Sequence, residues 1–532
     1  MLNISHTYQG DIIPSRTKWI YTVSGLGRDA VYAMVSVFLL TFIQEAGYLS
    51  KDPSQYAAMF AVISGLIIGY RVFDAVNDPF MGVIIEKVHF KTGKYKPWIF
   101  VGALTNTIVV LALFLTPAFC DWCHGWGFVV WFAVFYLLWG MTFTMNDIAF
   151  CSMLPSLSSN EQQRAKITSL LMIFENGGSF LVSLLIPMLA KPEANGGLGT
   201  KAYWIGALII GGLFVIGQSA LFLFCHEHER DLKAEKKSDP PRFKDMIDIL
   251  VKNKLVRIMA IVMFIWFISL FTLNGLLQNV FYLAVGYSAG KDLMSYFSFV
   301  QIAAIVLPML FMPRILEKVP KMKVFKISIS AMVISYLLFF IYGSPIGGNG
   351  ASLAPSVNFG DPSLNANSAA YATILFIITF VMFVANSCTY NVIYLFMENT
   401  VEYNEYHFGQ RKESVIFSLR PFATKMASSI QMLITDAALF STGFINVSGE
   451  INRINDEIGH GDIDPDVGAK QLEQLMIDSS NNLGMIYGMR IWCVIIPAIL
   501  LLVTLFLLTK FYDLSDDQYR KMCAEIKKRK RV

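Results

Sequence analysis

Long apolar stretches separated by short polar segments repeat along the whole chain. Windows of about 20 apolar residues, long enough to cross a bilayer as a helix, predict twelve spans in two sets. The first set lies near 22–46, 56–86, 97–118, 126–154, 165–190 and 203–225. The second lies near 255–286, 291–313, 323–343, 369–396, 413–443 and 483–511. The pattern predicts an all-α polytopic membrane protein, and an even number of spans puts both termini on one side.

A charged segment separates the two sets of spans. We expect an N-terminal six-helix half, a linker, a C-terminal six-helix half and a basic tail, at 1–225, 226–254, 255–511 and 512–532. Lys and Arg collect after the second and eighth spans, in the linker and in the tail, whereas the segments 119–125 and 344–368 contain none. Because basic loops stay in the cytoplasm, both termini are predicted to be cytoplasmic. Two six-helix halves around a midplane site are typical of the major facilitator fold.

Composition excludes several classes of function. The chain is 55% hydrophobic and only 15% charged, against about 25% charged residues in soluble proteins. No cleavable signal is expected, because the first apolar stretch is long enough to span. We find no nucleophile–base set, phosphate loop or metal-ligand cluster in the sequence, so we expect no enzyme, no cofactor and no nucleic-acid partner. The expected location is the cell membrane, and the sequence does not indicate an oligomeric state.

One short motif resembles a cofactor site. Cys120, Cys123 and His124 match the C-x-x-C-H pattern of c-type haem attachment. The loop that carries them is too short to wrap a macrocycle, so haem is not expected. The cysteines are interpreted as free thiols or as a local disulfide.

Charged and amide side chains interrupt the second span. Arg71, Asp74, Asn77 and Asp78 lie in the middle of an apolar segment, where a charge costs roughly 2.5–3.5 kcal/mol or more. Asp74, Asn77 and Asp78 share one helical face, since they lie three and four residues apart. These oxygen ligands predict a site for a hard cation such as Na⁺, or for a proton.

Other spans also carry polar residues that need a partner. Arg28 and Asp29 are either a neutralising pair near a helix start or a solute contact through Asp29. Asp147 in the fourth span has Thr144 three residues before it, so a hydroxyl and a carboxylate share a face. In the eleventh span Lys425 follows Arg420, and Lys425 is expected to seek carboxylates of the other half. Glu175 is interpreted equally as lining a cavity or as part of a helix-packing segment.

At these residues the chain resembles the glycoside–pentoside–hexuronide:cation symporters, a family of major facilitators. The resemblance covers nearly the whole chain. It rests on the segments 74–79, 93–98 and 136–147, on Arg28-Asp29, and on the segments 397–403 and 411–414 followed by Lys425. The family implies a cation site at Asp74, Asn77, Asp78 and Thr144, solute contacts at Arg28, Asp29 and Asp147, and a link to the C-terminal half at Lys425. Together with Arg71 and Arg420, Lys425 is predicted to form a charge network.

The chain also departs from the family's melibiose carrier. Cys151 stands where a Trp would stack on the sugar, and Met172 stands where a sugar-binding Arg is expected. Asn399 and Glu402 replace two aspartates, and the loops 344–368 and 447–480 are long.

From these features we predict a symporter that couples Na⁺ or H⁺ to uptake of a sugar or glycoside by alternating access. The alternatives are a cation-coupled carrier of a lipid-like or anionic solute and a transport-inactive sensor. The predicted partners are the solute and the lipid bilayer.

Overall fold

The computed structural model describes residues 13–88, 90, 92–157, 161–225, 243–342, 365–409 and 413–529. They are almost entirely helical, with one isolated bridge between Phe90 and Gly93. The linker residues 226–242, most of the loop 344–368 and the residues 410–412 and 530–532 lie outside the described part.

The chain forms two compact units. Unit 1 comprises Met1–Ser238 with Ile445–Gln474, and unit 2 comprises Asp239–Phe444 with Leu475–Val532. The segment Ile445–Gln474 lies inside the predicted C-terminal half but folds with unit 1.

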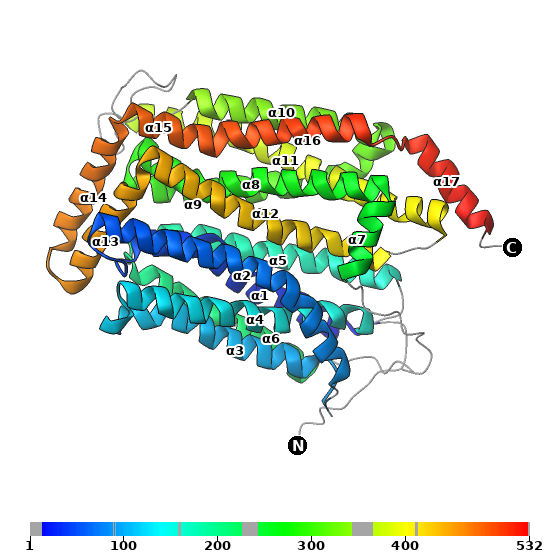
Figure 1. The fold of residues 1–532 in the computed structure, drawn as a ribbon, viewed down its shortest axis with the longest axis horizontal. Helices are drawn as coiled ribbons and strands as arrows, with labels where there is room; N and C mark the ends of the chain where they lie inside the picture. Colours follow the sequence, from blue (N-terminus) through cyan, green and yellow to red (C-terminus); the bar gives the residue numbers. More distant parts are fainter. Residues whose placement is uncertain are drawn as a thin grey trace. The chain divides into compact units, whose positions relative to one another are not determined.

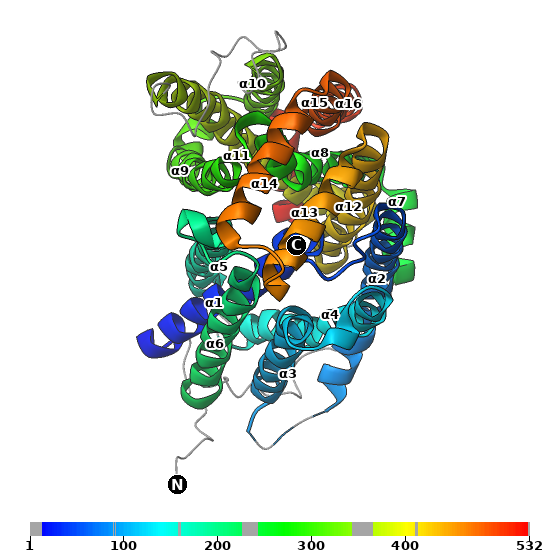
Figure 2. The same ribbon diagram turned by 90° about the vertical axis from the view of Figure 1, so that its left-hand side faces the viewer.

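Unit 1 is built around six long helices (Figure 1): α1 (Ser15–Glu45), α2 (Pro53–Lys87), α3 (Lys96–Leu115), α4 (Trp126–Leu157), α5 (Glu161–Leu189) and α6 (Lys201–Phe224). Viewed along their axes in Figure 2, α1, α5 and α6 lie side by side, and α1 packs against the other two. Helix α4 packs against both α2 and α3. Small residues permit this packing: a Cβ on Gly178 of α5 would lie only 2.1 Å from the carbonyl oxygen of Leu26.

The segment 447–480, expected to be a long loop, is mostly helical. It contains most of α13 (Phe444–His460) and all of α14 (Pro465–Ser480), and its residues up to Gln474 belong to unit 1. Short 3-10 turns at Thr116–Ala118 and Asp121–Cys123 connect α3 to α4, and a third lies at Glu193–Asn195 before α6.

Unit 2 contains the remaining helices. They are α7 (Phe243–Lys252), α8 (Lys254–Val285), α9 (Tyr287–Lys318), α10 (Lys321–Tyr342), α11 (Asn365–Phe408), α12 (Glu413–Thr442), α15 (Leu483–Arg490), α16 (Ile496–Phe511) and α17 (Asp516–Arg529). A π-helical turn, Ile491–Ile495, joins α15 to α16. Helix α8 packs against α9, α12 and α16, and α10 packs against α11.

Eleven of the described helices are long and apolar enough to cross a membrane. The twelfth candidate is the pair Phe422–Thr442 and Phe444–His460, which bends by 90° at Gly443 and reaches the required hydropathy only as a pair. Polar residues of α12 such as Arg420 and Lys425 explain why the eleventh predicted span is less apolar than the others. The prediction of an all-α polytopic membrane fold is confirmed.

Candidate cation and solute sites

Arg28 organises a charged cluster between three helices of unit 1. Its side chain is only 7% exposed, and one of its amino groups lies 3.0 Å from Asp147 Oδ1 on α4. The other lies 3.0 Å from Asp29 Oδ1 on α1 and also donates to Glu175 Oε1 on α5. The guanidinium carbon sits 4.6 Å above the centre of the Phe150 ring. The cluster therefore joins α1, α4 and α5 through one buried cation.

Arg28 also contacts its neighbour Asp29, as the alternative of a neutralising pair allows. Adjacent residues of a helix point apart. The long Arg28 side chain nevertheless curls back, and its Nε and one amino group donate to Asp29 Oδ1 at 3.2 and 3.0 Å. Arg28 is thus held by its own neighbour as well as by α4 and α5.

The three carboxylates differ from Arg28 in their exposure. The Asp147 side chain is 43% exposed, Asp29 27% and Glu175 18%. One guanidinium cannot neutralise three ionised carboxylates, and like charges so close together oppose joint ionisation. The exposed oxygens can accept hydrogen bonds from a solute, while the buried guanidinium fixes their positions. This arrangement suits recognition of a molecule with several hydroxyl groups.

Glu175 is the residue of this cluster whose role the sequence left undecided. Its carboxylate in an apolar span was the signal, but nothing in the sequence showed that α5 would bring it to Arg28. Cys151, one turn after Asp147, lies beside the same cluster. Its Sγ is 3.7 Å from an amino group of Arg28 and 3.9 Å from Asp147 Oδ1. A small thiol therefore stands where the family's melibiose carrier implies a Trp.

The predicted cation residues lie on α2 and on the facing part of α4. Asp74 is 8% exposed and Thr144 6% exposed. A Cβ on Gly140 of α4 would lie only 2.7 Å from Asp74 Oδ1, so the missing side chain at Gly140 lets the carboxylate contact α4. Thr144 follows Gly140 by four residues and shares its face. Asp74 thus meets α4 at the helical face that also carries Thr144.

The other members of the predicted cation set differ in how far they are described. Asn77 is half-buried, and its Nδ2 has no hydrogen-bond partner among the described residues. Asp78 belongs to α2, but its side chain lies outside the described part. Arg71 is 7% exposed and lies 5.8 Å from the centre of the Trp139 ring. Arg71 precedes Asp74 by one turn, so a buried cation and a buried carboxylate share this face of α2.

One face of α4 carries residues of both the candidate cation site and the charged cluster around Arg28. Gly140, Thr144, Asp147 and Cys151 follow one another at intervals of four, three and four residues, which places them on one helical face. Gly140 faces Asp74, Asp147 and Cys151 contact Arg28, and Thr144 lies between them on the same face. Cation and solute candidates are therefore neighbours along a single helix.

The basic residues predicted to join the two halves lie in unit 2. The guanidinium of Arg420 lies 5.7 Å from the ring centre of Tyr390 and 5.8 Å from that of Tyr394. Lys425 is half-buried, five residues further along α12. A charge bridge from Lys425 to the carboxylates of unit 1 stays a prediction.

Comparisons with known proteins show which family and which relatives this sequence matches. The family model described as MFS/sugar transport protein matches residues 20–516. An uncharacterized symporter of Bacillus subtilis (strain 168), YnaJ, is 23% identical over 96% of this chain and 94% of its own length. The lactose permease of Lactobacillus delbrueckii subsp. bulgaricus is 22% identical over 77% of this chain, and the match spans 60% of that longer permease.

Solved structures show the same fold at lower identity. A bacterial homolog of the human lysosomal transporter Spinster, in an inward-facing and unoccupied conformation, has a TM-score of 0.53 and 14% identity. The match covers 93% of this chain and 96% of that one. This likeness bears on the fold and not on the solute.

Proposed function

Because the chain belongs to the family of MFS/sugar transport proteins, we propose that it is a secondary active symporter that couples Na⁺ or H⁺ to uptake of a sugar or glycoside. Membership confirms the resemblance to sugar:cation symporters and the multi-pass membrane location. It also makes the protein a member of a transporter family rather than an enzyme family. The observation that carries the proposal is the charged cluster of Arg28 with Asp29, Asp147 and Glu175, buried in an apolar helix bundle.

In this proposal the carboxylates of the cluster bind solute hydroxyls. Hydrogen bonds to a charged acceptor contribute about 1.5–3 kcal/mol each, more than those between neutral groups. Arg28 holds Asp29 and Asp147 in place by donating hydrogen bonds to their carboxylates. It can also donate to the solute where the solute presents an acceptor oxygen. A sugar, which offers many hydroxyls on a rigid ring, fits such a set of acceptors. The lactose permease among the relatives supports this choice over a lipid-like or anionic solute.

The coupling cation binds at Asp74, with Asn77, Asp78 and Thr144 as further oxygen ligands. A cation or proton there would relieve the repulsion between the Asp74 and Asp78 carboxylates, which oppose joint ionisation when close. Carboxylate, amide and hydroxyl oxygens suit a hard cation such as Na⁺, and a carboxylate pair also accepts a proton. Binding at one site would favour binding at the other by the same factor, because the coupling free energy is reciprocal. The two halves then expose the loaded site to either side in turn, with both termini in the cytoplasm.

Counterflow and concentrative uptake in proteoliposomes test the proposal together. A panel of labelled sugars and glycosides is offered while Na⁺ and pH gradients are varied separately. We expect at least one sugar to accumulate only when a cation gradient is imposed. Asp74→Asn should abolish accumulation driven by the gradient and retain solute exchange by counterflow. Full concentrative uptake by Asp74→Asn would refute the assignment of the cation site, and failure of every sugar would leave the lipid-like or anionic carrier as the better hypothesis.

A further inference from the structure

Helix α13 is fastened to the turn between α1 and α2 in unit 1. The side chain of Asn452 pairs in both directions with the backbone of Leu49, each bond being 3.4 Å long. Asn455 Nδ2 donates to the carbonyl oxygen of Glu45 at 2.7 Å. These amide contacts hold the end of α13 in a fixed position above the start of α4.

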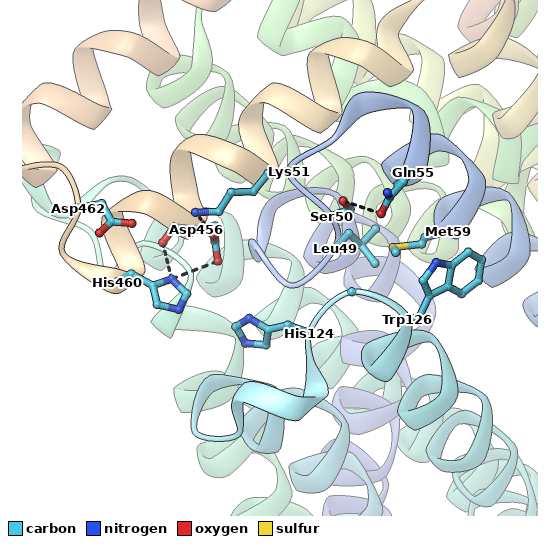
Figure 3. Close-up of a pocket in the computed structure, with 11 residues that line it drawn as sticks. Leu49, Ser50, Lys51, Gln55, Met59, His124, Trp126, Asp456, His460 and Asp462 are labelled. Atoms are coloured by element: carbon cyan, nitrogen blue, oxygen red, sulfur yellow. Dashed lines mark hydrogen bonds and ion pairs between the residues drawn. The ribbon is translucent and has the colours of Figure 1, made fainter.

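Two histidines and an aspartate come together at this place. His124 precedes α4, whereas Asp456 and His460 lie one turn apart on α13, and all three line an open pocket (Figure 3). One ligand atom of each residue lies within 4.8 Å of the other two. The two imidazole rings are 5.8 Å apart between centres and nearly perpendicular, at 81°. Nothing in the transport cycle proposed above uses these side chains.

Hydrogen bonds leave each imidazole one nitrogen for a ligand. His124 Nε2 lies 3.1 Å from the carbonyl oxygen of Pro117. His460 Nδ1 lies 3.0 Å from the carbonyl oxygen of Asp456 and 3.2 Å from Asp456 Oδ1. A carbonyl oxygen only accepts, so these nitrogens carry the proton in the neutral rings. The lone pairs therefore reside on His124 Nδ1 and His460 Nε2. Metal-binding histidines in proteins show this same arrangement, in which the other ring nitrogen donates to a carbonyl or carboxylate.

The turn before α4 is positioned as well as α13 is. The backbone N–H of Gly125, next to His124, donates to the carbonyl oxygen of Tyr48 at 2.7 Å. The Tyr48 ring lies 5.2 Å from the His124 ring between centres. Cys120 and Cys123 of the C-x-x-C-H motif are free thiols, and the motif's histidine faces α13. Both sides of the cluster are thus fixed by the same turn between α1 and α2.

We propose that His124, Asp456 and His460 form a binding site for one divalent ion of the zinc type. Two imidazoles and a carboxylate are a common three-ligand set for Zn²⁺, with water in the fourth position. Ligand atoms around a tetrahedral Zn²⁺ at about 2.1 Å lie about 3.4 Å apart. The ligand atoms of the cluster lie within 4.8 Å of one another, so they must approach by at most about 1.4 Å. His460 can move, since its side chain is 49% exposed. Imidazole ligands disfavour Mg²⁺ and Ca²⁺, which take oxygen ligands.

Lys51 competes with the ion for the same carboxylate. Its Nζ lies 2.8 Å from Asp456 Oδ2, and Asp456 is only 7% exposed whereas Lys51 is 50% exposed. An incoming ion must displace Lys51 toward solvent. Removing the ammonium group should therefore strengthen metal binding, an effect that a variant with a damaged fold would not show.

Equilibrium dialysis of the purified full-length protein against Zn²⁺ tests this site, with Co²⁺ absorption as a report of tetrahedral geometry. We expect one ion per chain that competes with Co²⁺ and is not displaced by Mg²⁺. His124→Ala and His460→Ala should each weaken binding by more than about 10-fold, and Lys51→Met should tighten it. His407→Ala, at an exposed histidine of α11, is the matched control and should bind as the wild type does.

The outcomes separate a metal site from a purely structural ion pair. Loss of binding in both histidine variants together with a gain in Lys51→Met supports the proposal. Binding that is absent in the wild type, or unchanged in the His124→Ala/His460→Ala double variant, overturns it. Uptake is not measured in this experiment, so the outcome of the metal-binding measurement does not depend on the proposed transport function.

Discussion

Gly140→Ala is expected to disturb the cation site without unfolding the protein. The added Cβ would lie 2.7 Å from Asp74 Oδ1, 3.5 Å from the carboxylate carbon and 3.6 Å from Oδ2. Its nearest contact is therefore the far end of a side chain and not a helix backbone. The carboxylate can rotate away while α2 and α4 remain packed.

The required displacement sets the size of the effect. An ordinary contact with a Cβ begins near 3.4 Å, so Oδ1 must move by about 0.7 Å. Binding groups must be held within about 0.5 Å of their working geometry, and a misplacement of about 1 Å can cost about 100-fold. We expect the cation concentration for half-maximal uptake to rise by about 10- to 100-fold. The stability of α4 should not fall for lack of helix propensity, since Ala stabilises a helix by up to about 1 kcal/mol over Gly.

Uptake measured against Na⁺ and against pH in proteoliposomes checks this prediction. Gly69→Ala is the matched control, because it makes the same change on α2 where a Cβ would meet nothing within 4 Å. Counterflow should be retained in both variants, which separates the cation site from the solute site. Cation dependence equal to that of the wild type in Gly140→Ala would refute the contact between Asp74 and α4. Loss of the folded protein would refute the claim that the Asp74 side chain can yield.

Three further substitutions test other parts of unit 1. Arg28→Ala leaves three carboxylates without their shared cation and removes a charged hydrogen-bond donor, worth about 1.5–3 kcal/mol. Binding of the transported sugar should therefore fall by about 10- to 100-fold in equilibrium dialysis. Glu175→Gln keeps the shape of the side chain and an acceptor for Arg28 but removes the charge. If Glu175 contacts the solute, KM for the solute should rise about 10-fold. If Glu175 only packs, KM should be unchanged. Gly47→Ala forces a residue with φ of +81° to carry a side chain, which would lie 2.8 Å from the α13 backbone at Asp456; thermal unfolding should show a loss of at least about 1–3 kcal/mol.

The helices were largely predictable because each span is a continuous apolar run long enough to cross a bilayer. The windows near 203–225 and 255–286 match α6 (Lys201–Phe224) and α8 (Lys254–Val285) within a few residues. A continuous apolar run of this length has one stable solution in a bilayer, since every backbone group must be paired inside the helix. The cost of burying charge likewise singles out Arg28, Asp74 and Asp147 from the sequence alone.

What the sequence could not predict is which distant residues meet. Glu175 lies far along the chain from Arg28, and only the packing of α5 against α1 brings the two together. The segment 447–480 looked like a long loop because its polar residues break the apolar pattern. Within this segment Asn452 and Asn455 hold α13 by hydrogen bonds to the backbone at Leu49 and Glu45. Long-range contacts of this kind leave no periodic signal in the sequence.

The face of α4 that carries residues of both sites gives the proposed coupling a physical route. Thr144 and Asp147 lie three residues apart on one rigid helix, yet the first belongs to the proposed cation site and the second contacts Arg28. A change at Asp74 that shifts or rotates α4 must therefore also change the distances within the solute cluster. Coupling carried by one helix between adjacent sites needs no long pathway, and it acts equally in both directions. Gly140→Ala leaves α4 in place but loosens the contact of Asp74 with it, so the transported sugar should tighten cation binding to a smaller degree than in the wild type.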